Sequence, residues 1–264
     1  MKRRITKAVF ILALLVFLGA LGYLGFIWFS YRSAEKGYEQ LAEAVLQKRE
    51  IAAEENEEGE TGALWTPLSV NFDALKAVSE DAVLWIDIPG TQVSYPVAQA
   101  EDNDYYLRRK LNGENSFAGT VFMDYRNDPA VSDDNTIFYG HNMRNGSMFG
   151  MLKQYGKEEF FLAHPEIDLY LPDRILRCTV ISSHQEEAQE ENFPTNFKSG
   201  EEKTAYINRM KSRAWYDTGI TADETDRLIT LVTCTGNGYS HRFVVQAVVM
   251  EETALETGSN AAAQ

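Results

Sequence analysis

Few side chains in this chain could act as a nucleophile with a nearby base: there are two cysteines and four histidines among 264 residues. Cys234 ends the apolar run RLITLVTC, and a polar loop that contains glycine follows it. A thiol at the mouth of a strand, next to a loop, is placed to react. Cys178 lies inside the run ILRCTVISS, where a cysteine is typically a small buried hydrophobe. These settings predict that Cys234 is the nucleophile.

A nucleophilic cysteine needs a base or a positive neighbour that favours its thiolate. His141 is the best-placed histidine, because it ends the strand-like run NTIFYGH in a polar, glycine-flanked segment. Arg242 opens the next strand-like run after Cys234, so a hairpin would set the two side by side, and its guanidinium could hold an oxyanion. Each residue, taken singly, is also compatible with a structural role. The other histidines are expected at a helix end, a strand-to-loop exit and a strand start: His164, His184 and His241.

The charged residues exclude some kinds of function. The formal net charge is −14, so the chain lacks the excess of Lys and Arg that neutralises phosphates, and a nucleic-acid partner is not expected. The acidic clusters at 123–128 and 132–135 do not match a calcium-binding loop, and we interpret them as solvated turns. No metal or other cofactor is expected.

The elements that would position these residues are mostly strands. Runs rich in β-branched and aromatic residues, separated by turn formers, predict strands over 83–88, 93–97, 119–125, 135–141, 167–171, 175–183, 227–234 and 242–250. Helices are expected over 33–49, 71–78, 147–155 and 199–214, with Asn71 as an N-cap and a capping box from Ser199 to Glu202. Many short strands with a few helices are typical of a β-barrel or sandwich.

The N-terminal segment predicts a membrane anchor. Residues 1–7 form a basic head without an acid, and residues 8–29 carry no charge and are long enough for a transmembrane helix. The positive-inside rule keeps the head in the cytoplasm, so the rest of the chain faces outward. A cleaved signal peptide is the alternative, and it also exports the chain. Export makes a disulfide between the two cysteines a further alternative.

The exported part divides into three segments. Residues 30–63 form a helical and then acidic linker, residues 64–252 form one domain, and residues 253–264 form a flexible tail.

The ordered motifs resemble those of the sortase family. TLVTC (230–234), YGHNM (139–143) and the arginine at the head of the following strand resemble that family's Cys–His–Arg set. WIDIPGTQVSYPVAQAEDNDYYL, AGTVFMDYRND and HPEIDLYLPD resemble its class B members, and the resemblance covers about residues 69–250. It implies a mainly β fold: an eight-stranded β-barrel with N-terminal helices, a helix in the connection before the Cys-bearing strand, and one preceding transmembrane helix.

By this resemblance, Cys234 attacks the carbonyl of a Thr in the C-terminal sorting motif of a secreted protein. His141 then protonates the leaving amine, and Arg242 holds the oxyanion. An amine of the peptidoglycan precursor or cross-bridge resolves the thioacyl intermediate, which makes the reaction a transpeptidation at the cell membrane. A pilin-polymerising sortase, with a pilin Lys as acceptor, is an alternative. Another exported cysteine peptidase and a non-enzymatic anchored binding module are alternatives from other classes.

The resemblance also implies a set of substrate-binding residues. Asn103, Leu107 and Tyr139 correspond to positions in the substrate groove of the family. Val232 stands where many class B members have Ser, and Thr235 follows the cysteine where an acidic residue can occur. These two departures mean that the preferred sorting motif cannot be copied from a relative.

Overall fold

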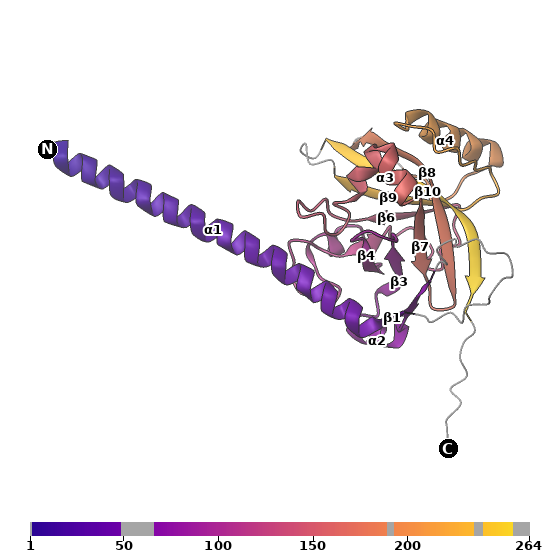
Figure 1. Ribbon diagram of the computed structural model, residues 1–264, viewed down its shortest axis with the longest axis horizontal. Helices are drawn as coiled ribbons and strands as arrows, with labels where there is room; N and C mark the ends of the chain where they lie inside the picture. Colours follow the sequence, from indigo (N-terminus) through magenta and orange to yellow (C-terminus); the bar gives the residue numbers. More distant parts are fainter. Residues whose placement is uncertain (1, 49–65, 189–192, 235–239, 256–264) are drawn as a thin grey trace, which may run out of the picture.

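A closed β-barrel forms the centre of the computed structural model, which describes residues 2–48, 66–188, 193–234 and 240–255 (Figure 1). The order of strands around the barrel is β10-β8-β7-β3-β4-β5-β6-β9. These strands are β3 (Ala82–Asp87), β4 (Ser94–Ala98), β5 (Val121–Met123), β6 (Asn135–Tyr139), β7 (Glu166–Tyr170), β8 (Arg174–Glu187), β9 (Leu228–Cys234) and β10 (His241–Ala254). A separate small sheet pairs β1 (Leu46–Lys48) with β2 (Leu68–Val70).

All eight predicted strands are present, and the predicted barrel is confirmed. Most neighbours around the barrel are antiparallel, but β4 pairs with β5 in parallel, and β6 pairs with β9 in parallel. The second parallel pair matters for function, because the residues that follow β6 and those that end β9 meet at the same edge of the barrel. β10 runs to Ala254, slightly beyond the expected end of the domain.

The helices lie outside the barrel (Figure 1). They are α1 (Lys2–Val45), α2 (Phe72–Val78), α3 (Glu158–Ala163) and α4 (Gly200–Arg213), with short 3₁₀ helices η1 (Tyr105–Arg108) and η2 (Leu152–Gly156). The helix predicted over 147–155 is wrong. Met148 has a φ of 54°, a left-handed conformation that stops a right-handed helix, so only the short η2 forms there.

Both predicted helix caps form. The Asn71 side chain accepts a hydrogen bond from the Ala74 amide at the start of α2. Ser199 Oγ accepts from the Glu202 amide at the start of α4, and the Glu202 carboxylate accepts in return from the Lys198 amide. The reciprocal bond thus reaches one residue further back than in the usual capping box. α4 lies in the connection between β8 and β9, where the family resemblance places a helix.

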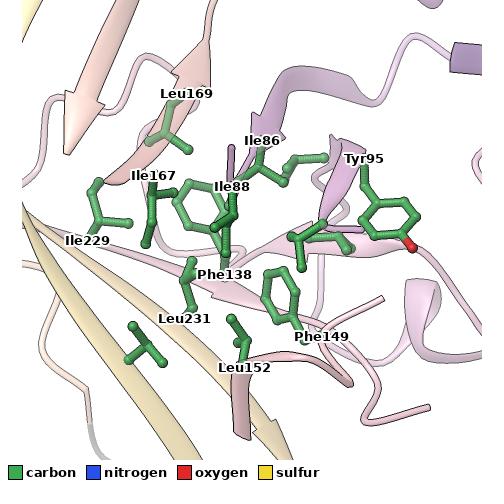
Figure 2. Packing of buried hydrophobic residues seen from close by; sticks show 14 of the residues in the cluster. Ile86, Ile88, Tyr95, Phe138, Phe149, Leu152, Ile167, Leu169, Ile229 and Leu231 are labelled. Atoms are coloured by element: carbon green, nitrogen blue, oxygen red, sulfur yellow. The ribbon is translucent and has the colours of Figure 1, made fainter. Parts of the chain in front are cut away.

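The barrel interior holds the main hydrophobic core (Figure 2). Side chains alternate along each strand, so one set points inward and the other outward. On β9, Ile229 and Leu231 join the interior cluster, where Phe138 of β6 and Ile167 of β7 also lie. The intervening Thr230 and Val232 belong to the outer face, which α4 partly covers. Burial of this interior is the main source of the barrel's stability.

The C-terminal end of α1 packs on the barrel, while its N-terminal part extends away from it (Figure 1). Tyr38 is 9 % exposed, stacks edge-on against Tyr95, and donates its hydroxyl to the Gly119 carbonyl. Burial raises the pKa of Tyr38 to about 12. Within the described residues, no helix is both long enough and apolar enough to cross a membrane. The transmembrane helix expected over residues 8–29 stays a prediction.

Candidate active site

Three neighbouring strands bring the predicted catalytic residues to one edge of the barrel. β6 and β9 are parallel, and Tyr139 pairs with Val232. His141 lies two residues beyond Tyr139, and Cys234 lies two residues beyond Val232, so their backbones reach the same level on adjacent strands. β10 returns antiparallel to β9 with Arg242 paired directly with Cys234. Adjacent strands lie about 4.8 Å apart, so the backbones of the three residues are neighbours.

The two threonines of the TLVTC motif hold these strands together. Thr233 is 3 % exposed, and its hydroxyl donates a 2.7 Å hydrogen bond to the Gly140 carbonyl, immediately before His141. Thr230, which is fully buried, donates to Asn135 Oδ1 of β6 at 2.8 Å. The motif therefore ties the cysteine-bearing strand to the histidine-bearing strand by side-chain bonds in addition to the backbone ladder.

A backbone carbonyl sets the orientation of the His141 ring. His141 Nε2 lies 2.7 Å from the Leu107 carbonyl oxygen. A carbonyl only accepts hydrogen bonds, so Nε2 carries a hydrogen and Nδ1 is the ring nitrogen that this bond does not engage. Gly119 allows this carbonyl to approach, because a Cβ there would lie 2.8 Å from the Leu107 oxygen, and its φ of +63° also favours glycine.

The other cysteine and histidines have structural surroundings. Cys178 is a free, fully buried thiol on β8, and burial raises its pKa far above the usual value. The prediction that Cys178 is a small core residue is confirmed, and the alternative that it forms a disulfide with Cys234 is wrong. His164 caps the end of α3 as expected, and its Nδ1 donates to the Pro89 carbonyl, which can only accept. His241 starts β10 as expected. His184 is fully buried inside β8, so its predicted place at a strand exit is wrong.

The predicted substrate-binding residues surround the same edge to different degrees. Leu107 touches His141 through its carbonyl, and Tyr139 pairs with Val232. Val232 is 1 % exposed and belongs to an apolar cluster with Ile137, Phe193 and Val244, so its side chain is covered. Thr235 lies outside the described residues. Asn103 lies in the loop before η1 and takes part in a polar network.

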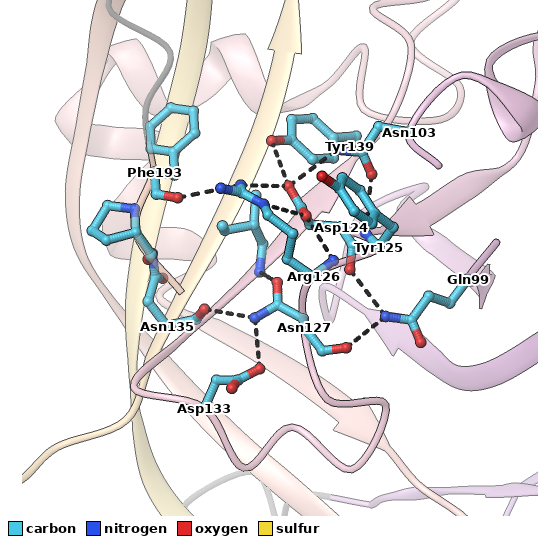
Figure 3. Close-up of polar contacts among 12 residues, drawn as sticks. Gln99, Asn103, Asp124, Tyr125, Arg126, Asn127, Asp133, Asn135, Tyr139 and Phe193 are labelled. Atoms are coloured by element: carbon cyan, nitrogen blue, oxygen red, sulfur yellow. Dashed lines mark hydrogen bonds and ion pairs between the residues drawn. The ribbon is translucent and has the colours of Figure 1, made fainter. Parts of the chain in front are cut away.

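That network is centred on Asp124, a residue for which the sequence predicted only a solvated turn (Figure 3). Asp124 is 0 % exposed, so the prediction is wrong at this position. Its carboxylate accepts hydrogen bonds from Arg126 Nε at 2.8 Å and Nη2 at 2.8 Å, from Asn103 Nδ2 at 3.1 Å, and from the Tyr139 hydroxyl at 3.2 Å. Opposite charges two residues apart, directly after a buried strand, were the available sequence signal. Two of the predicted substrate-binding residues thus share one buried anion.

The charge of Asp124 is stabilised by its partners. Burial by itself raises the pKa of Asp124, but hydrogen bonds and the positive charge of Arg126 outweigh that effect, so its pKa falls below the usual value. The pKa of Arg126 is raised in turn, mainly by its hydrogen bonds to Asp124. Within the described ranges, no cluster of three or more His, Cys, Asp or Glu side chains could hold a metal ion. A reaction without a metal stays a prediction.

Comparison with known proteins agrees with this geometry. The family model for the sortase domain matches residues 86–250. Sortase B of Listeria monocytogenes is 34 % identical over 160 residues, which span 61 % of this chain and 65 % of that relative, just under two thirds. A crystal structure of sortase B from B. anthracis superposes with a TM-score of 0.71 and 30 % identity, covering 85 % of this chain and 100 % of the other.

A structure described as the Staphylococcus aureus sortase B–substrate complex also matches. Its TM-score is 0.65, with 28 % identity over 69 % of this chain and 85 % of the other. The segment that the family model matches, residues 86–250, contains β6, β9 and most of β10, the strands that position the predicted catalytic residues. The chain therefore belongs to the sortase family, and its relatives place it in class B.

Proposed function

We propose that this chain is a cysteine transpeptidase that cleaves a C-terminal sorting motif after Thr and transfers the acyl group to an amine. The observation that carries the proposal is the backbone register: Cys234 pairs with Arg242 of β10 on one side, and on the other side its strand β9 pairs in parallel with β6, two residues beyond which lies His141. Family membership removes the alternative of an unrelated cysteine peptidase. A non-enzymatic binding module is disfavoured, because the chain retains the nucleophile, the proton donor and the cation.

In the proposed reaction, the Cys234 thiolate attacks the carbonyl carbon of the substrate Thr, and the carbonyl oxygen becomes an oxyanion beside Arg242. The C–N bond then breaks. The leaving amine takes a proton from the His141 imidazolium, and a thioacyl enzyme forms. An incoming amine attacks the thioester and loses a proton to His141, and the Cys234 thiolate leaves.

The proton moves through Nδ1 of His141 in this scheme. Nε2 is engaged with the Leu107 carbonyl, so the ring can exchange a proton through Nδ1 without losing that bond. The proposal therefore assigns to Leu107 a backbone role in addition to its place in the predicted substrate groove.

The substrates in this proposal are secreted proteins with a C-terminal sorting signal. The S. aureus relative is described as a complex with its substrate, which supports substrate binding by this fold. The acceptor is an amine of the peptidoglycan precursor or cross-bridge, as the resemblance to class B implies. A pilin Lys as acceptor would give a pilin-polymerising enzyme, and the acceptor in the assay below separates the two.

We further propose that residues 8–29 anchor the enzyme in the cell membrane, with residues 1–7 in the cytoplasm and the barrel outside. The absence of charge over residues 8–29 and the basic head support this orientation. Large apolar side chains on α1 are also exposed, among them Phe10 at 68 %, Leu12 at 64 % and Leu15 at 61 %. Extraction of membranes with carbonate tests the anchor: retention in the pellet supports it, and release contradicts it.

The activity is tested with the full-length chain in detergent. Quenched peptides with LPxTG-, NPxTN- and SPxTG-like motifs are incubated with and without a peptidoglycan-like amine or a lysine peptide, and products are identified by mass spectrometry. We expect cleavage after Thr, and we expect an amide product only when an amine is present. Cys234→Ala should abolish both, whereas the matched control Cys178→Ala should keep them. Equal activity in the Cys234→Ala variant would overturn the proposal.

A further inference from the structure

The Asp124 carboxylate joins three chain segments at the edge of the proposed active site (Figure 3). It accepts from Asn103, in the loop before η1, and from the Tyr139 hydroxyl at the end of β6. Asn103 in turn accepts at its Oδ1 from the Tyr125 amide at 3.0 Å. The Asn103 side chain therefore holds the loop that leads to Leu107 against the segment after β5, through both its amide nitrogen and its amide oxygen.

Arg126 connects this group to a fourth segment. Its Nη2 donates to Asp124 and also, at 3.3 Å, to the carbonyl of Phe193 in the connection between β8 and α4. The Phe193 side chain is 2 % exposed and packs in the cluster that contains Val232, two residues before Cys234. One guanidinium thus links the loop of Asn103 to the connection that covers the cysteine-bearing strand.

The location of this pair separates it from the ordinary core. The barrel interior is apolar and lies on the inner face of the strands, whereas Tyr139, which bonds to Asp124, packs against two apolar clusters outside that interior. The free energy of a buried carboxylate also depends strongly on its hydrogen-bond partners, because each lost bond leaves part of the charge uncompensated.

We propose that Asp124 and Arg126 are positioning residues that set the separation between the two walls of the substrate groove. One wall is the loop of Asn103 and Leu107, and the other is the part of the β8–α4 connection that contains Phe193. The inference rests on the proposed function for its catalytic consequence, but not for its structural one. Neither residue needs to touch the reacting atoms: Asp124 and Arg126 act through Asn103, Tyr139 and Phe193.

The sharpest variant is Arg126→Lys, which keeps the charge but cannot bond both carboxylate oxygens and the Phe193 carbonyl with a planar fork. Arg174→Lys is the matched control. Arg174 likewise links a carboxylate, that of Asp173, to a backbone carbonyl, that of Ala130, but it lies at the start of β8. Asp124→Asn serves as a second test variant, because it keeps the size of the side chain and removes the anion.

Two measurements on the full-length chain decide the inference. Hydrogen–deuterium exchange should become faster in both 103–107 and 193–197 in Arg126→Lys, with the interior strands and the Arg174→Lys control unchanged. For the most active peptide, KM should rise about tenfold, the order expected for one or two lost hydrogen bonds, whereas alkylation of Cys234 by iodoacetamide should stay within about twofold of wild type.

The outcomes separate the inference from the proposed function. Unchanged exchange in either segment, or an equal loss of alkylation and peptide turnover, would overturn the positioning role. If the wild-type chain cleaves no peptide while Arg126→Lys loosens both segments, the positioning of the walls holds and the proposed activity fails. If Arg174→Lys loosens the same segments, the effect belongs to the fold in general and the inference is wrong.

Discussion

Thr233→Val tests whether the TLVTC motif positions the histidine as well as carrying the cysteine. The substitution keeps the branched shape and removes the hydroxyl that donates to the Gly140 carbonyl at 2.7 Å. Thr233 is 3 % exposed, so water cannot reach the Gly140 carbonyl through the position of the lost hydroxyl. A buried carbonyl left without its donor costs about 1–3 kcal/mol. Gly140 is only partly buried, so we expect about 1–2 kcal/mol.

Strand β6, which pairs with the strand of Thr233, contains a matched control. Thr136 of β6 is also fully buried, but its hydroxyl has no hydrogen-bond partner among the described residues. Thr136→Val removes an unpaired polar group, so it should leave stability unchanged or raise it slightly. The chemical change is the same in both variants, and only the presence of a bond to the residue before His141 differs.

The assay combines thermal unfolding with peptide turnover. A loss of about 1–2 kcal/mol should lower the melting temperature of Thr233→Val by about 2–8 °C, and turnover at a temperature where the variant is folded should fall at least about tenfold. Thr136→Val should match the wild type in both. Equal shifts in the two variants, or full turnover by Thr233→Val, would refute the idea that this hydroxyl holds His141 in register.

Three further predictions concern Arg242, Cys178 and Asp124. Arg242→Lys should lower kcat about 10²-fold, the usual effect of losing one oxyanion donor, with melting unchanged; wild-type turnover would remove Arg242 from the mechanism. Cys178 should resist iodoacetamide in the folded chain and react only after unfolding, because burial raises its pKa; mass spectrometry of labelled native protein showing modified Cys178 would contradict its burial. The pKa of Asp124 is lower in the folded than in the unfolded chain. The ionised Asp124 therefore stabilises the folded state above about pH 4, and this stabilisation is lost as the pH falls further. The gap in unfolding free energy between wild type and Asp124→Asn should therefore be constant near neutral pH and narrow below about pH 4 in denaturant titrations; a gap that widens on acidification would contradict the assignment.

The sequence predicted the strands well because their composition is consistent with their burial. The run LITLVTC alternates residues for the barrel interior with residues for the outer face, and the pattern alone indicates a strand. It could not show that β6 and β9 are parallel neighbours, since pairing between distant segments depends on the closure of the whole barrel. That pairing is what brings His141 to the level of Cys234.

Polar contacts were the least predictable part. Asp124 was interpreted as part of a solvated turn because acidic clusters usually are, but the chain folds Asn103, Arg126 and Tyr139 around it. The helix expected over 147–155 has the right apolar spacing, and a left-handed Met148 interrupts it. In both cases tertiary contacts or backbone geometry decided the structure, and a short window of sequence holds neither.

The most direct test of the proposed mechanism is to trap the acyl enzyme. The full-length chain is mixed with a cleavable sorting peptide in the absence of an amine, quenched in acid, digested and analysed by mass spectrometry. We predict a hydroxylamine-sensitive acyl adduct that ends at the Thr of the motif and is carried by Cys234, with transfer to an amine added before the quench. Turnover without such an adduct, or an adduct on another residue, would contradict the central claim.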